Sequence, residues 1–256
     1  MDIKSDPKLR IQSIQIPGLK DHPQIDMLRL DEIHPIYGGN KYYKLKYHLE
    51  YVIKNGLKSI ISFGGPFSNH LYALSGFCNE YGINSYGIVR GYESYISNPT
   101  MSFCRQNKMN LVFLTPKEFD SEESIKSVLN QMDQNLSKVH IVPMGGTDDL
   151  GVKGASDILD KRISHYNKIA VSVGSGGTIS GIIRSSVKHQ EIIGFSALKN
   201  AYSLESIIDR YTKNYPKNWR LIHDYHFGGF AKQNSDLKEF TTEFYELNKI
   251  MIDPLY

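Results

Sequence analysis

Short apolar runs alternate along the chain with longer stretches whose apolar residues recur at helical spacing. Runs of this length are typical of buried strands, and the longer periodic stretches are typical of amphipathic helices. The expected strands are residues 58–64, 85–91, 110–115, 138–143, 168–174 and 191–197. The expected helices are residues 68–82, 98–108, 120–133, 150–163, 178–188, 203–213 and 236–248. Regular alternation of strands and helices predicts an α/β fold with parallel sheets.

Individual residues mark the ends of several expected helices. Ser68 stands where a side-chain oxygen can accept from the first free N–H groups, and Gly82 follows the last periodic residue. Pro99 falls in a first helical turn, where its missing N–H costs nothing. These signals fix the expected boundaries better than periodicity alone does.

One expected helix start carries the wrong charge. The stretch "GGNKYYKLKYHLEYV" (38–52) places Lys41 and Lys44 where its first helical turn should be. The N-terminus of a helix carries partial positive charge, so that acidic residues are the usual occupants of the first turn. The two lysines are therefore better explained by chemistry than by helix stability.

Composition describes an ordinary globular chain. Its 256 residues are 40% hydrophobic and 22% charged, with a mean hydropathy of -0.37. A net charge of +3 without a dense basic tract gives no case for nucleic acid or an anionic membrane as partner. Cys78 and Cys104 are too few for a disulfide framework, and the nine scattered histidines predict no metal site. No apolar signal or membrane-spanning run is seen, so we expect a cytoplasmic protein.

Glycine clusters fall at the carboxyl ends of the expected strands, where α/β folds bind their ligands. The stretch "VSVGSGGTISG" (171–181) leads from a strand into a helix, and such a loop forms a nest of N–H groups suited to an anion. Ile179 stands where a dinucleotide fingerprint needs its third glycine, and Ile182 follows Gly181 where a P-loop needs lysine. The loop therefore suits a single phosphate group, with a plain glycine-rich turn as the alternative.

A second strand-to-helix turn, "SFGGPFSNHLYAL" (62–74), presents polar side chains. Ser68 and Asn69 are expected either to cap the helix or to contact a ligand, and His70 either to lie on the surface or to join a site. The turn alone does not choose between these interpretations.

The lysines and the phosphate loop together indicate pyridoxal phosphate. Its phosphate would bind in the nest, and its aldehyde would condense with a lysine amine. A helix N-terminus and a second ammonium nearby lower the pKa of that amine and favour its attack.

The motifs taken in order resemble one known family. They are "GGNKYYKLKY" (38–47), "GGPFSNH" (64–70), "PMGGTDDLGVKG" (143–154), "GSGGTISG" (174–181), "YHFGGFAK" (225–232) and "DPLY" (253–256). Together they resemble the 1-aminocyclopropane-1-carboxylate deaminase / D-cysteine desulfhydrase family of pyridoxal-phosphate enzymes, from about residue 27 to the end.

The resemblance implies an architecture. It implies fold type II of pyridoxal-phosphate enzymes, the tryptophan synthase β-like fold, with two α/β domains and the cofactor in the cleft between them. A smaller inserted domain would span residues 46–148, and a larger one would combine residues 1–45 with residues 149–256. It also implies a small amino-acid substrate and a homodimer.

The resemblance also implies roles for residues. Lys41 matches the Schiff-base lysine, Lys44 a second lysine near the cofactor, and Asn69 the asparagine bonded to the pyridoxal hydroxyl. Ser68 matches a serine that faces the substrate, and Tyr256 a tyrosine that stacks on the pyridine ring. The phosphate loop corresponds to Gly174, Ser175, Gly176, Gly177 and Thr178, and the substrate side to Ser68, Asn69, His70 and Phe230.

The preferred reaction is conversion of D-cysteine to pyruvate, ammonia and sulfide. The cyclopropane deaminases more often have glutamine where His70 stands, and Phe230 replaces an active-site tyrosine. Both features weaken the case for opening of the cyclopropane ring, which is the alternative, and "SNH" (68–70) is closer to the desulfhydrase branch.

Two further hypotheses stay open. Family members continue beyond "DPLY" with a segment that faces the pyridine nitrogen, so we expect this chain to be C-terminally short. A catalytically weak relative that still binds the cofactor is therefore one alternative. The other is an α/β protein that binds a nucleotide or a sugar phosphate.

Overall fold

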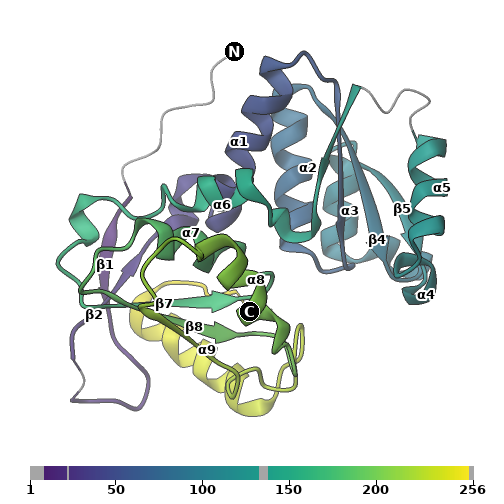
Figure 1. Cartoon of the computed structure of the whole chain (residues 1–256). Helices are drawn as coiled ribbons and strands as arrows, with labels where there is room; N and C mark the ends of the chain where they lie inside the picture. The colour runs from purple at the N-terminus through teal and green to yellow at the C-terminus, as the bar shows by residue number, and fades with distance from the viewer. Residues whose placement is uncertain (1–8, 22, 133–137, 254–256) are drawn as a thin grey trace.

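The computed structural model describes residues 9–21, 23–132 and 138–253, which form two lobes, each built on a parallel sheet (Figure 1). The first sheet has the strand order β5-β4-β3-β6 and the second the order β7-β8-β9. The strands are β3 (Ser59–Gly64), β4 (Asn84–Arg90), β5 (Asn110–Leu114), β6 (Val139–Val142), β7 (Lys168–Val173), β8 (Glu191–Ser196) and β9 (Trp219–Ile222). The predicted α/β architecture with parallel sheets is confirmed.

Helices connect the parallel strands and cover the sheets. Those of the first lobe are α1 (Asn40–Lys54), α2 (Asn69–Tyr81), α3 (Pro99–Gln106), α4 (Pro116–Phe119) and α5 (Glu122–Met132). The others are α6 (Asp149–Ala155), α7 (Gly177–Ser185), α8 (Ser203–Thr212) and α9 (Ser235–Asn248). None of the helices in the described part of the chain combines the length and the apolar character that a bilayer crossing demands.

Each lobe has its own apolar core. In the first, Leu45 and Leu49 of α1 pack with Leu74 and Phe77 of α2, all fully excluded from water. In the second, Ile183 of α7 packs with other buried aliphatic residues of α7, α8 and β8. Burial of each such side chain contributes roughly 1.5–3 kcal/mol. Leu159 packs against both cores, so the lobes are in contact there, and the boundaries predicted for the inserted domain (46–148) stay a prediction.

Helices α1 and α6 cross in close contact. A Cβ atom on Gly154 of α6 would lie 1.8 Å from the carbonyl oxygen of Tyr43 in α1, so only glycine fits there. Beyond the crossing, Asp157 accepts a hydrogen bond from Tyr47 Oη at 2.9 Å and lies 2.6 Å from Lys46 Nζ. These contacts fix α1 against the chain segment that leads into the second lobe.

The single helix predicted for residues 150–163 is wrong. Helix α6 ends at Ala155, and a separate 3-10 helix, η5, spans Lys161–Ile163. The Asp160 carboxylate accepts from the backbone N–H of Arg162 at 2.8 Å, and this cap begins a new turn. Periodicity alone cannot detect such a break.

Three short strands were not predicted. β1 (Ile11–Ile14) and β2 (Ile25–Leu28) form an antiparallel pair, and β9 lies at the edge of the second sheet. Each has four residues, too few for a clear pattern. Ile14 of β1 packs against Phe244 of α9, so contacts distant in sequence stabilise the antiparallel pair.

Candidate active site

Helix α1 presents the two lysines. It begins at Asn40, after Gly39, whose φ of 77° suits glycine and whose position lacks a side-chain cap. Lys41 therefore lies in the first turn, as predicted, whereas Lys44 lies at the start of the second turn, which corrects the prediction. A spacing of three residues places both side chains on one face of the helix.

The Lys41 amine is linked to the start of α7. Lys41 Nζ donates to Asn40 Oδ1 at 3.1 Å, and Asn40 Nδ2 donates to Thr178 Oγ1 at 2.8 Å. Burial lowers the pKa of Lys41 to about 8, against an opposing effect of Asp253. An appreciable fraction of this amine is therefore uncharged near neutral pH, as a nucleophile or a base requires.

Lys44 is buried among hydroxyl groups and is only 1% exposed. Its Nζ donates to Thr147 Oγ1 at 2.9 Å and lies 3.4 Å from Ser175 Oγ, while the two hydroxyl oxygens are 2.6 Å apart. Burial and then the charge of Lys41 hold the pKa of Lys44 well below its usual range. Among the described residues Lys44 has no carboxylate in ion-pair contact, unlike Lys46. An anion bound here would supply the missing negative charge.

Thr147 was missed by the sequence analysis. It follows the pair Gly145-Gly146 after β6, and that glycine cluster was the available signal. Nothing in the local pattern distinguishes a threonine that holds a buried amine from one on the surface.

The glycine loop leaves the N-terminus of α7 open. Gly176 is the N-cap, with a φ of 81° and no side-chain hydrogen bond to the helix. A Cβ atom on Gly177 would lie 2.6 Å from Lys44 Nζ and 2.8 Å from Thr147 Oγ1. The first N–H groups of α7, the Lys44 amine and two hydroxyls therefore meet at one place, with Gly174 in the turn just before it. Such a set of donors fits a phosphate group.

The other strand-to-helix turn is closed. Ser68 Oγ accepts from the backbone N–H of Leu71 at 3.2 Å, which confirms Ser68 as the N-cap of α2. Asn69 begins the helix, and its Nδ2 donates to the Asp253 carboxylate. As a hydrogen-bond acceptor Ser68 keeps its hydroxyl proton, which remains available for a ligand.

His70 is buried rather than on the surface, with 2% exposure. Ser62 Oγ donates a hydrogen bond to Val142 O at 2.8 Å and lies 2.8 Å from His70 Nε2. Because the serine proton is already used, Nε2 carries a proton and donates a hydrogen bond to the serine oxygen. His70 Nδ1 has no hydrogen-bond partner among the described residues. Burial, then Lys41 and Lys44, keep the pKa of His70 well below its usual range. His70 is thus a neutral imidazole close to both lysines.

Two predicted site residues remain, Phe230 and Tyr256. Phe230 is partly buried, in the segment between β9 and α9, after Gly229 with a φ of 111°. Tyr256 falls outside the described residues, so its predicted stacking role stays a prediction.

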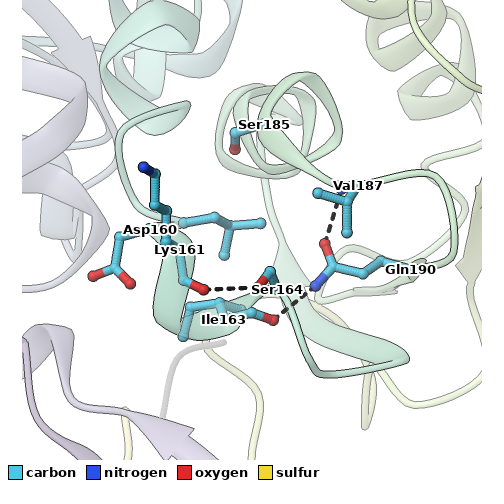
Figure 2. Close-up of a pocket in the computed structure, with 8 residues that line it drawn as sticks. Asp160, Lys161, Ile163, Ser164, Ser185, Val187 and Gln190 are labelled. Carbon is cyan, nitrogen blue, oxygen red and sulfur yellow. Dashed lines mark hydrogen bonds between the residues drawn. The ribbon is translucent and has the colours of Figure 1, made fainter.

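A pocket elsewhere on the molecule contains none of the predicted site residues. It is lined by Leu159, Asp160, Lys161, Ile163, Ser164, Ser185, Val187 and Gln190. Figure 2 shows that polar groups in it bond to one another: the Gln190 amide spans the backbone of Ile163 and Val187. In the described part of the chain no group of three or more histidine, cysteine or acidic side chains could hold a metal ion.

Comparison with known proteins identifies relatives over most of the chain. The putative 1-aminocyclopropane-1-carboxylate deaminase of Thermotoga maritima is 25% identical over 248 residues, which cover 90% of this chain and 79% of the relative. The D-cysteine desulfhydrase of Salmonella paratyphi A is 21% identical over 271 residues, covering 94% of this chain and 80% of the relative. No known family model matches the chain.

Solved structures support the fold. The crystal structure of an ACC deaminase homologue aligns with a TM-score of 0.82 at 20% identity, covering 100% of this chain and 83% of the other. A pyridoxal 5'-phosphate-dependent aspartate racemase aligns with a TM-score of 0.63 at 14% identity, covering 96% and 80% of the two chains. The predicted fold type II and the family resemblance drawn from the motifs are both confirmed.

Proposed function

Because this chain is homologous over most of its length to 1-aminocyclopropane-1-carboxylate deaminases and D-cysteine desulfhydrases, we propose that it is a pyridoxal-phosphate-dependent lyase acting on D-cysteine. The observation that carries the proposal is the meeting of Lys41, Lys44 and the open N-terminus of α7. Lys41 suits covalent attachment and Lys44 suits contact with a phosphate. Pyridoxal phosphate needs both functions.

The described residues fit the cofactor. Ser175, Gly176, Gly177 and Thr178 at the start of α7 would hold the phosphate, with Gly174 in the turn before them. The phosphate charge would favour the protonated form of Lys44, which would then pair with it. Lys41 would bond covalently to the cofactor, and Asn69 would bond its ring hydroxyl. We keep Tyr256 as the residue proposed to stack on the ring. When bound, pyridoxal phosphate supplies an electron sink for charge that develops on the amino-acid carbons.

The chain itself would bind the substrate and move a proton. We assign Lys41 Nζ as the base that takes the proton from the α-carbon of D-cysteine, since its pKa of about 8 leaves part of it uncharged. The Ser68 hydroxyl, which keeps its proton, would donate to the substrate carboxylate. The overall reaction consumes one water and yields pyruvate, ammonia and hydrogen sulfide.

His70 and Phe230 support D-cysteine over the cyclopropane amino acid as substrate. His70 is neutral, with one ring nitrogen bonded to Ser62, and Phe230 carries no hydroxyl to assist ring opening. Deamination of 1-aminocyclopropane-1-carboxylate is the second candidate, because relatives of both kinds match the chain. A relative that binds the cofactor but turns over slowly is the third.

The setting of the enzyme is part of the proposal. We propose that it works as a homodimer, as the family resemblance implies. We also propose the cytoplasm as its location. Its modest charge of +3 is compatible with a protein whose partner is a small molecule.

The test is a visible absorption titration with pyridoxal phosphate, followed by a sulfide assay with D-cysteine. We expect wild type to develop the band of covalently bound cofactor, and Lys41→Ala to lose both band and sulfide release. Lys44→Met should keep the band at saturation but weaken binding about tenfold to a hundredfold, since a hydrogen bond to a charged group contributes roughly 1.5–3 kcal/mol.

Lys188→Met is the matched control, because Lys188 is exposed. It should behave as wild type. A Lys41→Ala protein that still forms the covalent band would refute the assignment of Lys41. A band in wild type without sulfide would favour the second or third candidate.

A further inference from the structure

Three titratable side chains form a chain of contacts beside the lysines. His140 of β6 places Nε2 2.9 Å from Nδ1 of His48 in α1. His48 Nε2 in turn lies 3.2 Å from Asp148 Oδ1. His48 is fully buried, whereas His140 and Asp148 are partly exposed. The proposed reaction uses none of the three.

The contacts limit where the ring protons can lie. With a neutral His48 whose Nε2–H faces the Asp148 carboxylate, Nδ1 accepts from His140 Nε2–H. The contact with Asp148 lacks the alignment of a good hydrogen bond, so its attraction is mainly electrostatic.

Helix α1 uses one face to hold two consecutive residues of the loop after β6. Lys44 and His48 are one helical turn apart and lie on the same face. Lys44 contacts Thr147, and His48 contacts Asp148, the next residue. The preceding Gly145 and Gly146 have φ of 67° and 62°. Glycine is conformationally permissive, so the conformation of this loop depends on side-chain contacts such as these.

Asp148 also connects the loop to α6 and to the charge of Lys44. Its Oδ1 accepts from the backbone N–H of Gly151 at 2.9 Å, as the N-cap of α6. Burial raises the pKa of Asp148, but its contact with His48 and the hydrogen bond from Gly151 outweigh this and keep the pKa below its usual value. The anionic carboxylate favours the charged form of Lys44.

We propose that His48 is a positioning residue for the phosphate site: by holding Asp148 it fixes the Thr147 hydroxyl against Lys44. The inference rests on the proposed function, in which this site binds the phosphate of pyridoxal phosphate. The His48 side chain makes no hydrogen bond or ion pair with the phosphate loop or with the Lys44 amine among the described contacts, so it acts through Asp148 and Thr147.

Two substitutions of His48 separate positioning from packing. In His48→Gln the terminal amide reaches the place of Nε2 and can still donate to Asp148. In His48→Asn the amide reaches only the place of Nδ1, so the contact with Asp148 is lost. We expect the Asn variant to weaken the Kd for pyridoxal phosphate about tenfold and the Gln variant to stay close to wild type.

The measurement is an equilibrium titration with pyridoxal phosphate, with melting of each variant recorded without cofactor. Asp148→Asn is a second test, because asparagine is as good an N-cap but carries no charge, and it should weaken binding similarly. His189→Asn, at an exposed histidine, is the control.

Equal affinity of wild type, His48→Asn and Asp148→Asn would overturn the inference. So would equal weakening in the Gln and Asn variants, which would mean that His48 acts only by packing. If the Asn variant does not fold, His48→Gln decides: weakening as large as that in Asp148→Asn would overturn the inference. Failure of wild type to bind the cofactor would instead refute the proposed function.

Discussion

The two strand-to-helix turns at the candidate site share a topology, and the N-cap residues of their helices differ in kind. Each leads from the carboxyl end of a parallel strand, β3 or β7, into a helix, α2 or α7. Ser68 caps α2 with its own side chain, whereas Gly176 caps α7 with none. The first helix thus satisfies a free N–H internally, and the second leaves its N–H groups for an external anion.

The titratable side chains near the two turns differ as well. A buried lysine, Lys44, stands against the open turn, and a neutral histidine, His70, stands in the helix after the closed one. The difference at the N-cap therefore accompanies a difference in the proposed roles of the turns: one orients polar side chains, and the other is proposed to bind phosphate.

The largest expected effect is at the open turn. In Gly177→Ala the new Cβ would stand 2.6 Å from Lys44 Nζ and 2.8 Å from Thr147 Oγ1, so both groups must move. We expect affinity for pyridoxal phosphate to fall about a hundredfold, since bonds of roughly 1.5–3 kcal/mol to a charged group are displaced. The measurement is a titration followed by visible absorption.

Gly65→Ala is the matched control at the closed turn, because a Cβ there would meet nothing within 4 Å. An equal loss of affinity in both variants would contradict the division between the turns.

A smaller effect is expected from pH, through Lys41. Covalent attachment needs the uncharged amine, and the pKa of Lys41 is lowered to about 8 by burial. The attachment rate should rise with pH, by about tenfold per unit below that pKa, and level off above it. Stopped-flow absorption at limiting cofactor measures this rate. A rate that rises without a plateau up to the ordinary pKa of lysine would show that Lys41 is not perturbed.

The smallest effect is expected at the closed turn. Ser68→Ala removes the cap of α2 and should lower the free energy of unfolding by about 1 kcal/mol, measured by urea denaturation. Ser68→Thr keeps an N-cap oxygen and should restore most of the stability. Cofactor affinity should stay unchanged in both, while sulfide release should fall in the alanine variant. A loss of phosphate affinity in Ser68→Ala would mean that the two turns are coupled.

Sequence patterns predicted the features that depend on neighbouring residues in the chain. Ser68 and Gly82 cap the two ends of α2 as expected, because caps depend on neighbouring residues only. Thr147 and His48 could not be assigned, because their contacts join segments that are far apart in the chain. Likewise the break in the helix predicted for 150–163 is accompanied by a contact of Asp157 with Lys46 of α1, which is distant in sequence, as well as by the cap at Asp160.

The crossing of α1 and α6 has a consequence for cooperativity. Tyr43, whose carbonyl faces Gly154, lies between Lys41 and Lys44 in the sequence of α1. The contact between the two helices therefore also positions both lysine side chains. Local unfolding that separated these helices would remove Lys41 and Lys44 from the site together. Amide hydrogens of α1 and α6 are therefore expected to exchange with solvent as one unit, in which the ability to bind cofactor is gained or lost in a single step.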